Sequence, residues 1–244
     1  MIQLLAPDEK KRISVDEDIY LSQNRFEKPK EIFKSISSII KDHNFPEQMS
    51  ICDMGCATGE FLYYFKTLFP KCSVTGFDIS KSMLELAKKM IPNGNFTEGN
   101  VNSTQSFLKD TYDVVTMTGV LSIFDDPRQS LTNCLSSIKK NGVVIISGSF
   151  NPHPIDVILR YRKSDSPEST MESGWNVHSC NTVEKIVKDI SPTAKCSWHD
   201  FHMPFSIKQT SDLMRTWTVK IDNDIALVNG ASQIVNMKIL EITQ

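Results

Sequence analysis

The chain has 244 residues, of which 40% are hydrophobic and 23% are charged, and its formal net charge is -2. This composition is typical of a globular chain that can bury a core, and the charge argues against a general nucleic-acid binder. No apolar run approaches the roughly 18 residues of a membrane span, so we expect no membrane segment.

The start of the chain and its cysteines indicate a cytoplasmic protein. The apolar stretch from Met1 to Pro7 is too short for the apolar region of a signal peptide, and acidic residues follow it. The six cysteines are scattered and form no Cys-x-x-Cys pair, so we predict neither a metal site nor a redox dithiol. Reduced thiols fit this compartment.

Residues 1 to about 28 are polar without a clear period and predict an extended or partly helical arm. A helix follows with Pro29 in its first turn, and it ends near His43. Tyr20 and Arg25 lie just before this helix. We expect the arm to close over a ligand, with Arg25 binding a carboxylate through its bidentate fork. The alternative is a solvated arginine and a packed tyrosine.

The most informative stretch is Ile-Cys-Asp-Met-Gly-Cys-Ala-Thr-Gly-Glu-Phe, residues 51–61. An apolar run reaches Asp53, a turn spans Gly55 to Gly59, and apolar residues at helical spacing begin at Phe61. Glycines allow the backbone to approach a ligand closely, and the start of a helix offers unpaired N–H groups. The pattern therefore predicts strand, turn and helix, with a nucleotide-type cofactor over the turn.

The charges of this turn favour one cofactor over another. A dinucleotide loop has the pattern G-x-G-x-x-G beneath a pyrophosphate, whereas Ala57 and Glu60 replace its second and third glycines here. No Lys or Arg occurs from residue 51 to residue 65. S-adenosylmethionine has no phosphate and carries a sulfonium and an amino group, so it suits this mildly acidic turn better.

The next two strands supply the other contacts of such a cofactor. A strand over residues 73–77 ends in Asp78, and a helix capped by Ser80 or Ser82 follows. Asp78 lies about twenty residues after the turn, where an acid accepts the ribose hydroxyls. After a short strand at 94–98, Asn100 and the N–H of Val101 are placed to meet the adenine edge, with a turn asparagine as the alternative.

The order of elements predicts an α/β fold. Residues 112–119 are nearly all apolar, as in a strand that is buried on both faces, and a helix over 127–138 and a strand over 143–150 follow. Strands that alternate with helices predict a doubly wound, mostly parallel sheet with helices on both faces. Ligands then bind at the carboxyl ends of the strands, where the turn, Asp78, Asn100 and Thr118 all fall.

These residues resemble the class I, Rossmann-like S-adenosylmethionine-dependent methyltransferases. The resemblance rests on Asp53 to Gly59, Gly76 to Ser80 with Met83-Leu84, Glu98 to Asn100, and Tyr112 to Leu121. It implies a seven-stranded sheet whose last strand is antiparallel, and S-adenosylhomocysteine as the product. The residues that it places at the cofactor, beside Arg25 and Val101, are Asp53, Gly55, Cys56, Ala57, Gly59, Asp78, Ile79, Met83, Asn100 and Thr118. The turn departs from the family at Ala57, where glycine is usual.

After residue 150 the pattern weakens. We predict a short helix over Ile155–Tyr161, a helix capped by Ser179 or Asn181 that runs to Ile190, strands over Lys195–Phe205 and Leu213–Ile221, and a C-terminal helix over Ile234–Ile242. The whole chain, 1–244, is expected to form one methyltransferase domain. Its parts are an arm and helix (1–45), a cofactor-binding core (46–150), a substrate lid (151–190) and C-terminal strands and helix (191–244).

The lid and the C-terminal part carry the substrate predictions. His178 is the preferred general base for an alcohol acceptor, with His153 and His202 as alternatives, and Trp175 and Asn176 lie beside His178. Arg160 and Arg215 are candidates to hold a phosphate or carboxylate. For each histidine and arginine the alternative is an ordinary packed or solvated side chain.

The sequence thus predicts O-methylation of a small polar metabolite, of sugar or sugar-phosphate type, by a monomer or homodimer. The C-terminal part loosely resembles methyltransferases of bacterial surface-polysaccharide biosynthesis. The rival interpretations are a nicotinamide-dependent oxidoreductase on a similar sheet and a non-catalytic cofactor-binding partner protein.

Overall fold

The computed structural model describes residues 16–22, 25–104, 107–165, 168, 170–222 and 224–244. Residues 16–22 are helical. The helices that follow are α2 (Glu31–Asp42), α3 (Glu60–Leu68), α4 (Lys81–Met90), the short 3-10 turn η1 (Leu121–Ile123), α5 (Arg128–Ser137) and α6 (Cys180–Ile190). The strands of the main sheet are β1 (Ser50–Met54), β2 (Ser73–Asp78), β3 (Asn95–Glu98), β4 (Tyr112–Thr118), β5 (Ile138–Asn151), β8 (His178–Ser179), β9 (Lys195–Asp200) and β12 (Met237–Thr243).

The main sheet has the path β3-β2-β1-β4-β5-β12-β9, and β8 pairs with the end of β5. β12 is antiparallel to both of its neighbours, whereas the pairs along β3-β2-β1-β4-β5 are parallel. The predicted seven-stranded, mostly parallel α/β sheet is therefore confirmed. The strand order reverses between β1 and β4, which is where ligands bind in such sheets.

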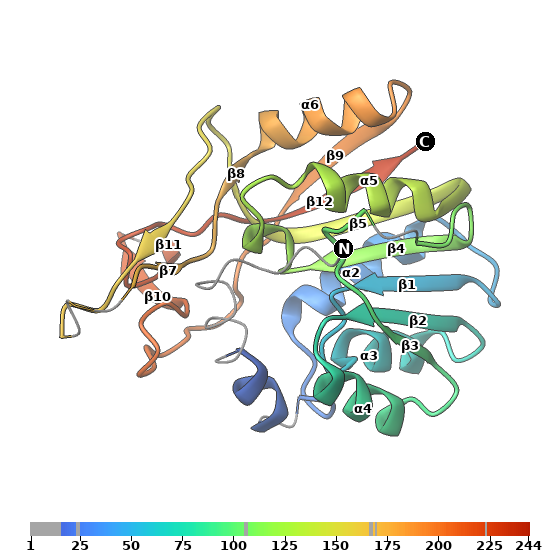
Figure 1. Ribbon diagram of the computed structural model, residues 1–244, viewed down its shortest axis with the longest axis horizontal. Coiled ribbons are helices and arrows are strands. Elements are labelled where there is room, and N and C mark those ends of the chain that lie inside the picture. Colours follow the sequence, from blue (N-terminus) through green and yellow to red (C-terminus); the bar gives the residue numbers. More distant parts are fainter. Residues whose placement is uncertain (1–15, 23–24, 105–106, 166–167, 169, 223) are drawn as a thin grey trace.

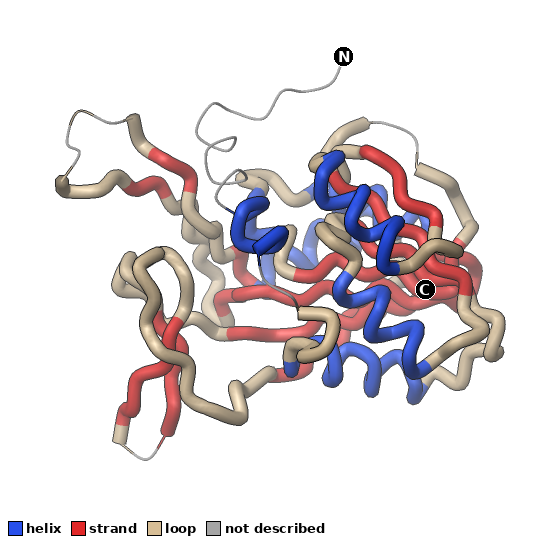
Figure 2. The backbone as a smooth tube through the Cα atoms, turned by 90° about the horizontal axis from the view of Figure 1, so that it is seen from below, coloured by secondary structure: helices blue, strands red, loops and turns tan. Residues whose placement is uncertain are grey.

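Helices cover both faces of the sheet (Figures 1 and 2). α2, α3 and α4 pack apolar side chains on one face, against Ile51, Val114 and Ile145 among others. α5 and α6 pack on the other face, against Val115, Met117 and similar residues. The strands are buried on both sides as a consequence, which explains their nearly continuous apolar sequences.

The predicted caps of two helices are confirmed. The hydroxyl oxygen of Ser80 accepts from the N–H of Met83 at the start of α4, and that of Ser179 accepts from the N–H of Thr182 at the start of α6. Each bond satisfies one N–H group that has no partner within the first turn of the helix.

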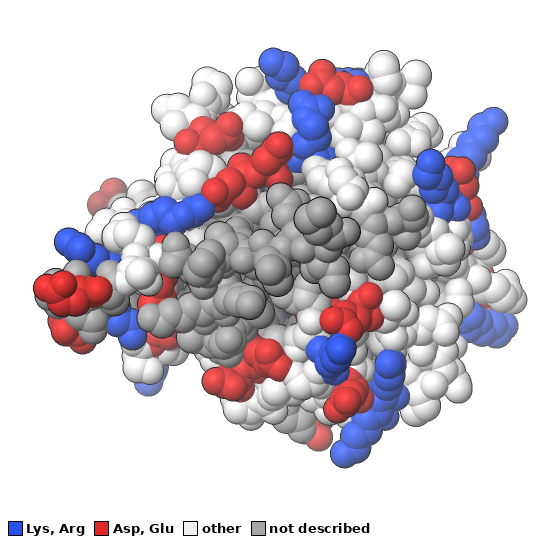
Figure 3. Space-filling view, viewed as in Figure 1, with Lys and Arg blue, Asp and Glu red and all other residues white. Residues whose placement is uncertain are grey.

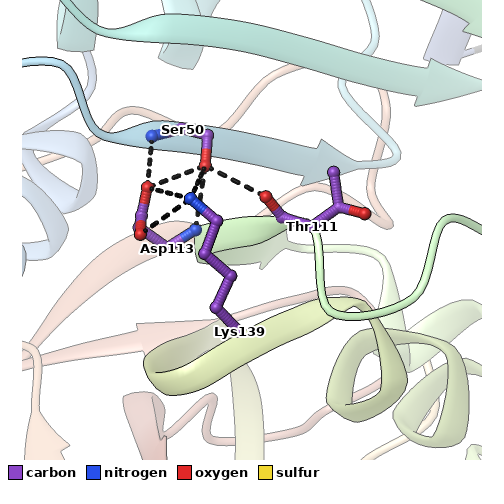
Figure 4. A network of polar contacts seen from close by, with 4 residues as sticks. All are labelled: Ser50, Thr111, Asp113 and Lys139. Atoms are coloured by element: carbon purple, nitrogen blue, oxygen red, sulfur yellow. Dashed lines mark hydrogen bonds and ion pairs between the residues drawn. The ribbon is translucent and has the colours of Figure 1, made fainter.

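Polar residues join β1, β4 and β5 at their amino ends (Figure 4). The Asp113 carboxylate accepts from the N–H and the hydroxyl of Ser50, both at 2.7 Å, and from Lys139 Nζ at 3.0 Å. The hydroxyl of Ser50 also lies 3.2 Å from the carbonyl oxygen of Thr111. This network is at the end of the sheet opposite the carboxyl ends of β1 and β4.

Three predicted elements after residue 150 are wrong. The predicted helix over Ile155–Tyr161 is extended chain that bridges to Val177 and ends in β6 (Arg160–Tyr161), which pairs with β7 (Glu172–Ser173). The predicted sheet strand over Leu213–Ile221 is only β10 (Trp217–Ile221), which forms a separate hairpin with β11 (Asp224–Val228). Both two-stranded sheets lie beyond the carboxyl ends of the parallel strands (Figure 1).

The third error is the predicted C-terminal helix over Ile234–Ile242, which is the strand β12. Leu240 and Ile242 pack into the core on one face of the sheet, and Ile239 packs into the core on the other. A short strand buried on both faces lacks alternation, so its apolar residues can match helical spacing by chance.

Candidate functional site

A pocket lies at the carboxyl ends of β1, β2 and β4. The space within it, including the part open to solvent, is about 770 Å³. Its lining residues are Asp16, Tyr20, Gly55, Ala57, Asp78, Ile79, Met83, Gly99, Asn100, Val101, Thr118, Gly119, Val120, Ile123 and Phe124. Eight residues of the predicted cofactor set are among them, namely Gly55, Ala57, Asp78, Ile79, Met83, Asn100, Val101 and Thr118.

The glycine turn forms one wall of this pocket. Gly55 has φ +85°, and a Cβ at this position would lie 2.4 Å from Cγ2 of Val120, so only glycine allows the turn to lie so close to the loop after β4. Gly59, with φ +80°, precedes α3 as its N-cap. Ala57 keeps the left-handed backbone with φ +47° although it has a side chain, which costs roughly 1–2 kcal/mol for a non-glycine residue.

Asp78 lies at the end of β2 and lines the pocket. Its Oδ2 accepts from the N–H of Ala57 and its Oδ1 accepts from the N–H of Ser80, both at 2.9 Å. Burial raises the pKa of this carboxyl, and the backbone hydrogen bonds from Ser80 and Ala57 act in the opposite direction. The carboxylate thus connects the glycine turn with the start of α4.

Asp53 lies behind the glycine turn instead of in the pocket wall. It is 2% exposed, and its carboxylate accepts from the hydroxyl of Thr116 at 2.7 Å. Burial raises its pKa to about 7, against the effect of the Thr116 hydrogen bond. Cys56 and Gly59 belong to the turn but are likewise absent from the lining.

Asn100 and Val101 line the opposite side. The Oδ1 of Asn100 accepts from the N–H of Asn102 at 2.9 Å, which is the turn role considered as the alternative. The side chain of Asn100 is still part of the pocket wall, so the two roles are compatible.

The arm contributes one lining residue that the sequence did not predict, Asp16, and one from the predicted closing arm, Tyr20. Asp16 and Tyr20, from the helix over 16–22, line the pocket. Tyr20 accepts from Lys30 Nζ at 3.2 Å, and its ring lies 5.2 Å from the guanidinium carbon of Arg25. Arg25 itself is not in the lining. A polar arm without periodicity carries no signal for Asp16, although Tyr20 was noticed as part of the closing arm.

Ile123 and Phe124 were also missed. They belong to the loop that begins with η1 after β4, and they line the pocket next to Val120. The stretch from Val120 to Pro127 reads from sequence only as the end of a strand, because nothing in it shows which side chains turn inward.

The predicted catalytic histidines do not line the pocket. His178 is 2% exposed, and its Nε2 lies 2.9 Å from the carbonyl oxygen of Phe124. A carbonyl oxygen only accepts, so this nitrogen must carry the hydrogen, and it cannot take a proton from a substrate. His153 is exposed in the loop after β5, and His202 lies in a separate groove near β11. This placement does not support the predicted role of His178 or His153 as the base.

Of the four predicted substrate residues, the two arginines are ion-paired and Asn176 is buried. The guanidinium of Arg160 lies 2.5 Å from the Asp125 carboxylate, and that of Arg215 lies 2.5 Å from the Asp16 carboxylate. The carbon at the centre of the Arg215 guanidinium is 5.5 Å from the centre of the Trp175 ring. Asn176 is fully buried and bonds to the loop around Phe124. The structure places these residues around the pocket, but none of them lines it.

The chemistry of the lining agrees with a phosphate-free cofactor. Among the described residues the pocket has two carboxylates, those of Asp16 and Asp78, and no Lys, Arg or His. The buried hydroxyl oxygen of Thr118 has no hydrogen-bond partner among the residues that the structure describes, which is typical of a position that a ligand or water satisfies. These groups suit hydroxyl and amino donors better than a pyrophosphate.

A family model described as a methyltransferase domain matches residues 46–213. The chain belongs to this methyltransferase-domain family. The family is S-adenosylmethionine-dependent, so the match agrees with the cofactor inferred from the turn.

Curated relatives match less than half of the chain. A malonyl-[acyl-carrier protein] O-methyltransferase of Halalkalibacterium halodurans is 32% identical over 111 residues, which are 43% of this chain and 41% of that protein. A demethylmenaquinone methyltransferase of Thermotoga maritima is 29% identical over 113 residues, 46% of this chain and 48% of that protein. The matches span less than half the length of these relatives.

Solved structures share the fold across nearly the whole chain. A methyltransferase from Haloferax volcanii, in complex with an activator protein, has a TM-score of 0.61 at 12% identity and covers 96% of this chain and 95% of its own. A TehB-like methyltransferase from Corynebacterium glutamicum has a TM-score of 0.55 at 12% identity and covers 97% of each. At this identity the similarity shows the fold alone.

Other kinds of site are absent from the described part of the chain. None of its helices is both long and apolar enough to cross a bilayer. No group of three or more His, Cys, Asp and Glu side chains there is arranged to hold a metal ion. On the face shown in Figure 3, basic and acidic side chains are interspersed and form no broad basic patch.

Proposed function

We propose that this protein transfers a methyl group from S-adenosylmethionine to an oxygen atom of a small, polar, sugar-type metabolite. The observation that carries the transfer is the pocket at the strand-order reversal, which collects the glycine turn, Asp78 and Thr118 in a chain of the methyltransferase-domain family. An oxygen acceptor is supported by relatives that are named as O-methyltransferases.

The proposed cofactor contacts follow the lining. Gly55, Ala57 and the backbone of Thr118 would hold the methionine part, with Asp53, Cys56 and Gly59 shaping the turn from behind. Asp78 would accept from the ribose hydroxyls, because a carboxylate with free lone pairs can bind both. Ile79, Met83, Asn100 and Val101 would enclose the adenine, and Arg25 stays a predicted carboxylate partner.

When bound, S-adenosylmethionine supplies an electrophilic methyl group, which an acceptor oxygen attacks in line with the departing sulfur. The protein's contribution is to hold the acceptor in that line, and positioning alone can account for much of a rate enhancement. Once these cofactor contacts are assigned, the side chains left in the lining are those of Asp16, Tyr20, Val120, Ile123 and Phe124. They would close the pocket around the methyl group, where they would touch both the cofactor and the acceptor.

The ion pairs of Arg160 and Arg215 favour an acceptor without a phosphate. Arg160 and Arg215 already bind the carboxylates of Asp125 and Asp16, so an anionic acceptor could use them only by breaking these pairs. A hydroxyl-rich acceptor could instead donate to Asp16. We therefore favour a neutral sugar-type molecule over a sugar phosphate.

The oxidoreductase alternative is disfavoured by the family match and by the lack of a cation in the described lining. The link to bacterial surface-polysaccharide biosynthesis, the monomeric or dimeric state, the cytoplasmic location and the division into arm, core, lid and C-terminal part stay predictions.

Calorimetry with S-adenosylhomocysteine tests the proposal. We expect the wild-type protein to bind it, and Asp78→Ala to weaken binding by about 1.5–3 kcal/mol, the contribution of hydrogen bonds to a charged group. Asp200→Ala is the matched control, because Asp200 also ends a strand of this sheet but lies outside the pocket. A wild-type protein that binds no S-adenosylhomocysteine would refute the function, and an unchanged affinity in Asp78→Ala would remove Asp78 from the site.

A further inference from the structure

Asn176 and His178 contact the pocket wall from behind. Both side chains lie in the lid insertion, on the segment that leads from β7 into β8, and both are buried, with exposures of 0% and 2%. They face the loop 121–126, which follows β4 and supplies Ile123 and Phe124 to the pocket. The predicted role of His178 as a base leaves this arrangement unexplained.

The side chain of Asn176 uses both of its N–H donors on this contact. Its Nδ2 donates to the carbonyl oxygen of Phe124 at 3.1 Å and to Oδ1 of Asp125 at 2.9 Å. Its Oδ1 accepts from the N–H of Leu159 at 2.9 Å, and its own N–H donates to the carbonyl oxygen of Ser122 at 2.8 Å. One residue thereby joins both lid segments to the loop.

His178 and Arg160 complete the attachment. His178 Nε2 donates to the same carbonyl oxygen of Phe124 at 2.9 Å, so that this oxygen receives two hydrogen bonds from the lid. Arg160 holds the second oxygen of Asp125. The loop thus has the lid on one side and the pocket on the other, and its position depends on buried hydrogen bonds that are costly to leave unmade.

We infer that Asn176 and His178 are positioning residues, which hold Ile123 and Phe124 in the pocket wall and so couple the lid insertion to cofactor affinity. This inference rests on the proposed function, since it concerns the same pocket. It assigns to His178 a hydrogen-bond donor role in place of acid–base chemistry. The two roles differ in what a glutamine at this position would do, because its amide nitrogen can reach the place of Nε2 and donate but cannot act as a base.

The test measures the affinity for S-adenosylhomocysteine by calorimetry, well below the melting temperature of each variant. We expect Asn176→Ala and His178→Ala to weaken binding by about tenfold, and His178→Gln to restore it to within about twofold of wild type. Asn229→Ala is the matched control. Asn229 is also a buried asparagine with several hydrogen bonds, but it lies near β11 and away from this pocket. We expect it to lower the melting temperature without changing the affinity.

A double-mutant cycle shows whether Asn176 acts through the wall. Phe124→Ala should weaken binding by itself, and the double variant with Asn176→Ala should be little weaker than the worse single variant, because coupled residues are not additive. Additive losses, or an unchanged affinity in folded Asn176→Ala and His178→Ala, would overturn the inference. If Asn176→Ala does not fold, the affinities of His178→Ala and His178→Gln for S-adenosylhomocysteine test the inference, and equal affinities would overturn it. A wild-type protein that fails to bind would instead count against the proposed function.

Discussion

Two aspartates lie near the carboxyl ends of neighbouring strands, yet their surroundings differ. Asp78 reaches the pocket and accepts from two backbone N–H groups, whereas Asp53 is enclosed behind the turn with the hydroxyl of Thr116 as its hydrogen-bond donor. Desolvation disfavours the charged form of an acid unless donors compensate. Burial therefore raises the pKa of Asp53 to about 7, which is within the physiological range.

The raised pKa of Asp53 predicts a pH-dependent stability. The unfolded chain loses this proton near the ordinary value of 3.8, but the folded chain keeps it up to about 7. The folded state thus binds more protons between these values, so its free energy of unfolding falls as the pH rises from about 4 to 7 and levels off above. Asp53→Asn cannot ionise but can still accept from Thr116, so the contribution of this site to its free energy of unfolding should not fall over this pH range.

Urea denaturation of the two proteins at several pH values measures the difference. We expect the stability of Asp53→Asn relative to wild type to increase with pH across this window, by up to about 1.4 kcal/mol per pH unit. Glu60 and Asp78 also have raised pKa values, but both proteins contain them. Their contributions to the pH dependence therefore largely cancel in the difference between the two proteins. Parallel pH profiles would contradict a protonated, buried Asp53.

At the scale of elements, a polar network that stabilises the sheet and the pocket lie at opposite ends of the strands. Asp113, Ser50 and Lys139 connect β1, β4 and β5 at their amino ends, while the pocket lies at the carboxyl ends (Figure 4). Burial acts to raise the pKa of Asp113, but the hydrogen bonds from Ser50 and Lys139 outweigh it and lower the pKa below its usual value. The ionised carboxylate therefore contributes stability above about pH 4, and this contribution is lost as the pH falls through the folded-state pKa.

Removing the charge of Asp113 should cost stability without affecting the pocket. We expect Asp113→Asn to lower the free energy of unfolding by about 1–2 kcal/mol at pH 7, since it weakens hydrogen bonds to a charged group that is only partly exposed. The affinity for S-adenosylhomocysteine should stay unchanged. Thermal denaturation and calorimetry on the same sample check both parts, and a reduced affinity would show that the two ends of the sheet are not independent.

The predictions for individual elements succeeded where a local signal was strong. Ser80 and Ser179 could be recognised as caps, because a cap is a contact within one turn of helix. The strand β12 was predicted as a helix, because its position between β5 and β9 depends on residues roughly 40 to 100 positions earlier in the chain. The extended chain at 155–161 was missed for the same reason, since its partners are Val177, Ser173 and Asn176.

At the scale of the whole molecule, segments that are far apart in the chain meet beside the pocket. Asp16 in the helix over 16–22 pairs with Arg215, which is 199 residues away, and Arg215 lies against Trp175. Glu17 accepts from the hydroxyls of Ser80 and Ser82 at the start of α4. The arm is thereby attached both to the cofactor-binding core and to the C-terminal part.

This attachment predicts a change in ligand dissociation. In Arg215→Gln the arm loses its ion pair, so we expect S-adenosylhomocysteine to dissociate roughly two- to fivefold faster, the effect of a partly exposed pair. Stopped-flow displacement measures this rate. Arg128→Gln is the control, because Arg128 forms an exposed pair with Asp189 away from the pocket. Equal rates in the two variants would show that the arm does not retain the ligand.

The sequence by itself determined the α/β class and the strand-turn-helix at residues 51–61, together with the acid that ends the next strand. Each of these features is encoded by residues that are close together in the sequence. The carboxyl ends of the parallel strands then lie at one edge of the sheet, which brings the turn and the acid together. Only the tertiary structure decided that His178 and Asn176 support the wall, that Arg160 and Arg215 are paired, and that Asp16 and Phe124 line the pocket. Whether a side chain lines a pocket or packs behind it depends on contacts between segments far apart in the chain, and such contacts leave no local pattern.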